Sequence, residues 1–145
     1  MISNHFIYNY IEQAVNTQSR PVYCATRLEI IPSSFPACYL LEINRYDRGA
    51  VNLMRTDRMK MITWEAQIFS NKMTGAVDEA YDILEDVDIA FAHLGFTQTY
   101  CQQVSNIDPS IYRLVGRWER MIGDGDAFPV TDYPAPDPTP EPNTP

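Results

Sequence analysis

Side chains that could perform acid–base chemistry or bind a metal are sparse in this chain. The sequence has only two histidines, His5 and His93, and His93 follows a long run of acidic residues. A histidine at the end of a helix usually interacts favourably with the helix dipole and needs no catalytic role. The sequence contains no HExxH and no other metal-binding spacing of histidine or cysteine. We therefore expect no metal site and no enzymatic activity.

The cysteines and glycines form no recognisable motif either. Cys24, Cys38 and Cys101 are odd in number and include no CxxC pair, so we expect reduced and mostly buried thiols. No GxSxG occurs, and no glycine-rich loop opens a helix where it could bind phosphate. Asp124 and Asp126 lack the rest of a calcium loop and indicate an ordinary turn. No cofactor is expected.

Charge is distributed unevenly along the chain, whose net charge is −8. Residues 76–94 carry six acids and no base, and residues 124–145 carry five acids and no base. The rest of the chain has eight acids and eleven bases, a net charge of +3. Stable nucleic-acid binding requires a dense basic surface, which this pattern does not supply. Contacts between copies of the protein, acidic face against basic loop, fit the pattern better.

The dense acids of residues 76–94 repel one another, and a basic partner would relieve that repulsion. The polar connection 46–58 with its flanks, a basic stretch over 45–60, is the obvious candidate, supplied by the same copy or by a neighbouring one. We expect this pairing to form a subunit interface, with a solvated helix face and loop as the alternative. The candidate interface residues are Arg55, Arg58, Asp82, Glu85 and Asp86.

Hydrophobic periodicity predicts the elements that would position these groups. Helices are expected at 3–16 and 75–94, and strands at 22–30, 38–45, 60–69, 97–105 and 111–122. This order predicts an α+β fold. A mostly antiparallel sheet of about four to five strands would be packed by the N-terminal helix and one long helix.

Two predicted strands alternate between an apolar and a polar face. In 60–69, Ile62, Trp64, Ala66 and Ile68 alternate with polar residues, and in 111–122 the apolar face includes Trp118. We expect the polar face to lie in water or to be buried in a partner. Its candidate residues are Glu65, Gln67, Arg113 and Arg117.

The long helix carries clear end signals. Thr74 is the expected N-cap, and Gly95 occupies the position of a left-handed residue after the helix, with Phe96 packing on Phe91. The expected buried stripe is Val77, Ala80, Leu84, Val87, Phe91 and Leu94. A helix of this length could cover a four-stranded sheet diagonally.

The last residues differ in composition from the remainder. Seven of the eleven prolines lie from Pro129 onward, among acidic residues and threonines. Such a segment cannot bury enough apolar surface to fold. We expect one domain over residues 1–128 and a disordered, acidic, proline-rich tail over 129–145. Neither a membrane span nor a signal peptide is predicted, so we expect assembly in a cytoplasm.

Taken together, these segments resemble the tail terminator (tail completion) proteins of long-tailed bacteriophages. The resemblance covers about residues 1–128. It rests on the N-terminal helix and on the segments 31–37, 64–72, 95–96, 104–108, 112–113 and 117–119. Their order and spacing, rather than any single segment, carry the resemblance.

The resemblance implies a structural virion protein without cofactor or catalytic residues. Members of that family form a homo-hexameric ring that caps the tail tube, ends tube polymerisation and offers a head-joining surface in the neck. The implied partners are the tail tube protein and the head-completion (stopper) protein, and DNA only crosses the ring in transit. In such a ring the polar sheet face would line the lumen or contact a partner. Two alternatives remain: another neck connector of the same particle, or a small cytoplasmic protein-binding module using the acidic helix or the tail.

Overall fold

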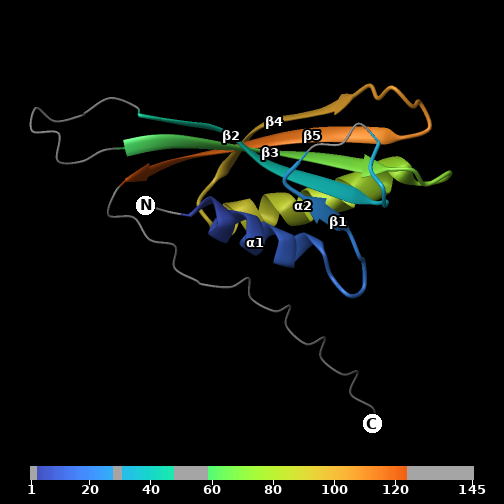
Figure 1. The fold of residues 1–145 in the computed structure, drawn as a ribbon, viewed down its shortest axis with the longest axis horizontal. Helices are drawn as coiled ribbons and strands as arrows, with labels where there is room; N and C mark the ends of the chain where they lie inside the picture. Colours follow the sequence, from blue (N-terminus) through green and yellow to red (C-terminus); the bar gives the residue numbers. More distant parts are fainter. Residues whose placement is uncertain (1–2, 28–30, 48–58, 124–145) are drawn as a thin grey trace, which may run out of the picture.

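The computed structural model describes residues 3–27, 31–47 and 59–123, which form a five-stranded sheet with two helices packed on one face (Figure 1). The elements in chain order are α1 (Asn4–Val15), β1 (Tyr23–Ala25), β2 (Ala37–Asp47), β3 (Met59–Ser70), α2 (Ala76–His93), β4 (Thr97–Val104) and β5 (Tyr112–Gly123). The predicted α+β fold is confirmed. The expected tail and most of the connection 46–58 lie outside the described residues.

The strand order is β1-β2-β3-β5-β4, and every neighbouring pair is antiparallel except β1 with β2. β3 is the central strand and pairs with β5 along its whole length, from Met59 opposite Gly123 to Ser70 opposite Tyr112. The register shifts once in β2, after Glu42, and once in β4, after Gln98. Of the strand expected at 22–30, residues 23–25 form β1, and residues 28–30 lie outside the described residues.

The start of α2 differs from the prediction. Gly75, not Thr74, is the N-cap, with a left-handed φ of 85° and no side-chain capping bond. Glycine adopts this conformation without the steric cost that threonine would meet. Val77 is also not part of the buried stripe, since 48% of it is exposed. It lies at the margin of the stripe, which Ile83 and Ala90 complete instead.

The predicted end of α2 is confirmed. Gly95 has a φ of 81°, and its N–H donates to the Ala92 carbonyl at 3.0 Å. The Phe96 N–H donates to the Phe91 carbonyl at 2.9 Å, and the two rings lie 5.2 Å apart. Both bonds of the Schellman motif are therefore present, together with its usual apolar contact.

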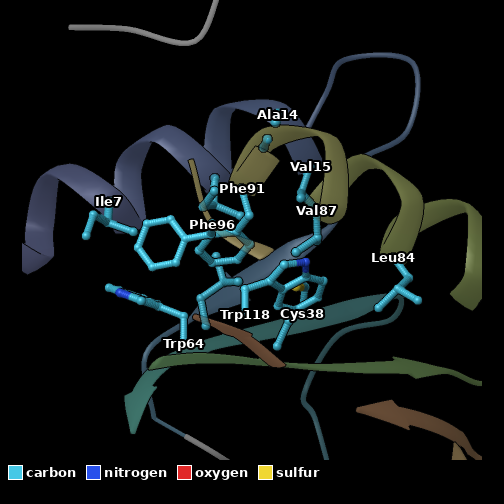
Figure 2. Close-up of a cluster of buried hydrophobic side chains, with 14 of the residues drawn as sticks. Ile7, Ala14, Val15, Cys38, Trp64, Leu84, Val87, Phe91, Phe96 and Trp118 are labelled. Atoms are coloured by element: carbon cyan, nitrogen blue, oxygen red, sulfur yellow. The ribbon is translucent and has the colours of Figure 1, made fainter. Parts of the chain in front are cut away.

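Aromatic rings fill the space between the helices and the sheet (Figure 2). Phe91 of α2 stacks on Trp118 of β5 at 4.9 Å and lies 6.2 Å from Trp64 of β3. Gly116 has no side chain and so leaves room for the Trp118 ring, because a Cβ at this position would lie 2.6 Å from Cη2 of that ring. The expected face of Ile62, Trp64, Ala66 and Ile68 belongs to this core.

Candidate interaction surface

The face of the sheet opposite the helices carries a hydrogen-bonded polar network, which we call the open-face network. It consists of Glu65 and Gln67 on β3 and Arg113 and Arg117 on β5. Glu65 Oε1 accepts a bond from Gln67 Nε2 at 2.6 Å, and Glu65 Oε2 accepts one from Arg117 Nε at 2.8 Å. Gln67 Oε1 accepts from Arg113 Nε at 3.1 Å and from Arg113 Nη2. The structure thus brings all four candidate sheet residues together.

Two aromatic rings hold the arginines of the open-face network in place. The Arg117 guanidinium lies 4.9 Å from the centre of the Tyr100 ring on β4, and that of Arg113 lies 5.5 Å from the Phe69 ring. Such contacts favour a fixed orientation of a planar guanidinium. The arginines therefore have defined positions without a partner protein.

The middle of this face is buried although both helices pack on the other side. Glu65 is 7% exposed and Gln67 is 6% exposed. Both lie on the central strand, where long side chains from neighbouring strands lie over them. Both carboxylate oxygens of Glu65 accept hydrogen bonds, so the network holds the four side chains in one arrangement.

A second apolar cluster closes one end of the open face. It contains Ala37, Tyr39, Phe69 and Ile111. The rings of Tyr39 and Phe69 meet edge to face at 5.5 Å. This cluster was not predicted from the sequence. The signal was present in the alternation of β3, because Phe69 continues the row of Glu65 and Gln67.

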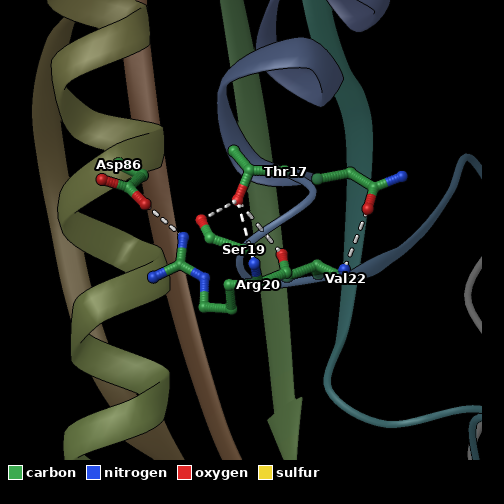
Figure 3. Close-up of polar contacts among 6 residues, drawn as sticks. Thr17, Ser19, Arg20, Val22 and Asp86 are labelled. Carbon is green, nitrogen blue, oxygen red and sulfur yellow. Dashed lines mark hydrogen bonds and ion pairs between the residues drawn. The ribbon is translucent and has the colours of Figure 1, made fainter. Parts of the chain in front are cut away.

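Among the acids of α2, Asp86 has a partner within its own chain. It forms an ion pair with Arg20, which lies in the segment between α1 and β1 (Figure 3). Thr17 fixes the backbone there, because its Oγ1 accepts a hydrogen bond from the Arg20 N–H at 3.2 Å. This local order positions the guanidinium against α2. Because Asp86 is already paired within its own chain, a contact with an arginine of a neighbouring copy would stabilise it less than the sequence indicated.

The other acids of α2 fall into two groups. Glu79 pairs with Lys72 at 3.1 Å, and Asp88 accepts a bond from the Trp118 indole at 2.8 Å. Asp78, Asp82 and Glu85 are exposed and form no ion pair with any residue that the structure describes. Arg55 and Arg58, the expected partners of Asp82 and Glu85, lie outside the described residues, so that pairing stays a prediction.

The remaining reactive side chains do not converge on a site. His5 and His93 are both exposed, on different helices. Burial raises the pKa of the Cys38 thiol well above its ordinary value, and burial with a smaller effect of Glu12 raises the pKa of Cys24 to about 12. Within residues 3–27, 31–47 and 59–123, no three His, Cys, Asp or Glu side chains are grouped so that they could hold a metal ion.

Comparisons with known proteins give no family for this chain. No protein-family model matches it, and no curated protein is similar to it in sequence. Neither helix of the described part is long and apolar enough to cross a membrane.

Proposed function

We propose that this protein is a structural component of a bacteriophage tail that forms a hexameric ring, caps the tail tube and ends its polymerisation. The head-proximal side of the ring would provide the joining surface for the head-completion protein in the neck. The observation that carries the proposal is a sheet with both described helices on one face and the open-face network on the other. The hydrogen bonds of that network are formed within one chain. The same chain also has the order of segments that resembles tail terminator proteins.

A ring subunit must expose large surfaces before assembly and remain folded while it does so. The open-face network meets this requirement, because its buried polar atoms form hydrogen bonds with one another and need no partner protein to do so. A structural role explains this pairing, because the network keeps its arrangement before any partner binds.

The charges of α2 support contact between copies. Asp78, Asp82 and Glu85 remain exposed without a partner in the described part of the chain. In a closed ring each copy meets its neighbour through two different surfaces, so an acidic patch can face a basic one at every joint. DNA would cross such a ring without stable binding, since the net charge of the chain is −8.

The direct test is assembly of the full chain with tail tube protein from the same particle. Native mass spectrometry should detect a hexamer, and electron microscopy should show one ring at the end of each tube. Tubes should also stop growing when the ring-forming protein is added to a polymerising mixture.

Two outcomes would count against this function. A protein that stays monomeric with tube protein, and leaves tube growth unchanged, would contradict the proposal and favour a protein-binding module. Rings that bind head-side proteins but not tubes would favour another neck connector. A chain truncated after Gly123 is a useful comparison, because it retains every described helix and strand.

A further inference from the structure

Two of the three cysteines are neighbours on adjacent strands. Cys24 on β1 lies directly opposite Cys38 on β2 in the parallel register of these strands. Side chains of directly opposite residues point to the same face of a sheet, and neighbouring strands lie about 4.8 Å apart. That spacing falls within the range of Cα separations, about 4.4–6.8 Å, over which a disulfide can form. The backbone therefore brings the two thiols within range of each other.

The packing around β1 shows that both thiols face the helices. Cys38 is fully buried in the core between the helices and the sheet (Figure 2), and Cys24 packs against the same core. The two chain neighbours of Cys24 point the other way. The Tyr23 ring lies 6.3 Å from the Tyr39 ring, and Ala25 packs against the second apolar cluster, to which Tyr39 belongs. Alternation along β1 thus directs Cys24 to the side of Cys38.

The two thiols differ in their access to solvent. Cys24 is only partly buried and belongs to a strand of three residues at the edge of the sheet, whereas Cys38 is fully buried. A dissolved reagent therefore reacts first with Cys24. Cys101 is a useful contrast, because its thiol is exposed and the residue opposite it on β5 is Gly116.

We propose that Cys24 and Cys38 form a dithiol site, which a small-molecule disulfide oxidises to an intrachain disulfide between β1 and β2. This inference goes beyond the proposed function, because it concerns a single copy of the chain. Both thiols stay reduced in a cytoplasm, and the bond forms when the protein enters oxidising surroundings. A virion component, as proposed above, meets that change when its particle leaves the host cell.

In the first step the reagent reacts with Cys24. The Cys24 thiol loses its proton to solvent, and its thiolate attacks one sulfur of the small disulfide. The sulfur–sulfur bond of the reagent breaks. One half of the reagent leaves as a thiolate and takes up a proton from water, and the other half stays on Cys24 as a mixed disulfide. Burial and the nearby Glu12 carboxylate raise the pKa of Cys24 to about 12, so this step is slow at neutral pH.

In the second step the Cys38 thiolate attacks the sulfur of Cys24. The bond between the two cysteines forms as the bond to the reagent breaks, and the departing thiolate takes up the proton that Cys38 has lost. Two electrons have then passed from the two cysteines to the reagent, which has become two thiols.

The surroundings of Cys38 favour this second step once the first has occurred. Burial raises the pKa of the Cys38 thiol, Cys24 raises it further, and Arg20 lowers it. A mixed disulfide carries no negative charge on the sulfur of Cys24. The first step therefore removes one of the two effects that oppose ionisation of Cys38, while the effect of Arg20 remains.

The bond would strengthen the shortest pairing of the sheet. β1 pairs only with residues 37–39 of β2 among the residues that the structure describes. A short edge strand opens locally more easily than a strand that is paired on both sides. Joining β1 to the fully buried Cys38 should therefore slow exchange of the β1 amide protons by about tenfold or more.

Oxidation of the folded, full-length Cys101→Ser variant by cystamine, a small disulfide, tests the proposal. This variant lacks the exposed thiol, so disulfides between chains do not obscure the result. Trypsin cleaves after Arg27 and separates Cys24 from Cys38, so the disulfide joins two peptides that mass spectrometry detects without reduction. We expect most chains to carry the linked peptides, with no cysteamine left on Cys24.

Two matched variants in the Cys101→Ser background separate the steps. Cys38→Ala should stop after the first step, so that one cysteamine stays on Cys24 in each chain. Cys24→Ala should leave Cys38 unmodified, because the reagent has no accessible thiol through which to act. Circular dichroism verifies that each variant is folded. Cysteamine on Cys38 in the folded Cys24→Ala variant would contradict the assigned order of steps.

Three results with the Cys101→Ser variant alone would overturn the proposal, so it remains testable if Cys38→Ala does not fold. The first is a linked pair that forms only after unfolding in urea. The second is a stable mixed disulfide on Cys24, which would show that Cys38 cannot attack it. The third is no reaction of either thiol in the folded protein. Unchanged amide exchange after oxidation would overturn the stabilising effect on β1. None of these measurements depends on ring assembly, so failure of the proposed function is a separate result.

Discussion

The two faces of the sheet achieve stability by different means. The helix-covered face buries aromatic rings, with Phe91 between Trp64, Phe96 and Trp118. On the open face, where no helix of the described residues packs, Glu65 and Gln67 are buried and form hydrogen bonds with two arginines. Alternation along β3 supplies both surfaces. A strand can therefore stabilise the domain with one row of side chains and keep the other row available for neighbours.

The largest effect is expected from removing an aromatic ring on the helix-covered face. Phe91→Ala should lower the free energy of unfolding by about 3–5 kcal/mol, because it leaves a cavity among three rings. Ile89→Ala on the exposed side of the same helix is the matched control and should change it by less than about 0.5 kcal/mol. Urea unfolding followed by circular dichroism measures both. Similar losses in the two variants would contradict the assignment of the core.

Crowding beneath Trp118 should produce the next largest effect. Gly116→Ala places a methyl group 2.6 Å from the Trp118 ring and 3.0 Å from Leu84 Cδ1. Forcing these groups apart should cost about 1–3 kcal/mol. Gly75→Ala is the comparison, since nothing lies within 4 Å of the added Cβ and only its left-handed backbone is strained.

Tryptophan fluorescence separates these two glycine effects. Gly116→Ala should change the emission of the folded protein, because it displaces the Trp118 ring. Gly75→Ala should lower stability without altering that emission. An unchanged spectrum in Gly116→Ala would show that the ring does not occupy this position.

On the open face, a smaller effect is expected from breaking the ion pair. Arg117→Met removes the cation from Glu65, whose side chain is only 9% exposed, while Arg117 itself is 45% exposed. Because solvent screens the arginine, we expect a loss of about 1–2 kcal/mol. Adding Glu65→Gln to Arg117→Met should recover part of this loss, since no buried charge then remains unpaired. Strictly additive losses in this double-mutant cycle would contradict the coupling.

The smallest expected effect is a difference in thiol reactivity between Cys38 in the buried core and Cys101 on β4 at the edge of the sheet. Cys101 is exposed, while Cys38 is fully buried. Burial and the Asp88 carboxylate raise the pKa of Cys101 above its ordinary value of 9.0. Its alkylation by iodoacetamide should therefore continue to accelerate as the pH rises past 9, because the thiolate is the reactive form. Peptide mass spectrometry should find Cys38 unmodified until the protein unfolds.

Much of this fold follows from local sequence signals. The alternation of Ile62, Trp64, Ala66 and Ile68 identified a covered strand face, and Gly95 with Phe96 identified the end of α2. These signals are readable because they depend on residues close together in the chain. The four residues of the open-face network were also selected from alternation alone.

Other features depend on packing between distant segments and could not be read in this way. The pairing of Arg20 with Asp86 joins residues 66 positions apart. The N-cap at Gly75 reflects a backbone conformation, although Thr74 has the better capping side chain. Val77 was assigned to the core from helical spacing, but its burial depends on where the stripe meets the sheet. The position of β5 between β3 and β4 is likewise a property of the assembled sheet.

The placement of both helices on one face separates two kinds of surface. The open face carries Glu65 and Glu119 against Arg113 and Arg117, so the charges of these four side chains cancel. The exposed side of α2 carries Asp78, Asp82 and Glu85. If the open face lined the bore of the proposed ring, a passing duplex would meet a wall of nearly zero net charge, and the acids of α2 would lie on the other side of that wall.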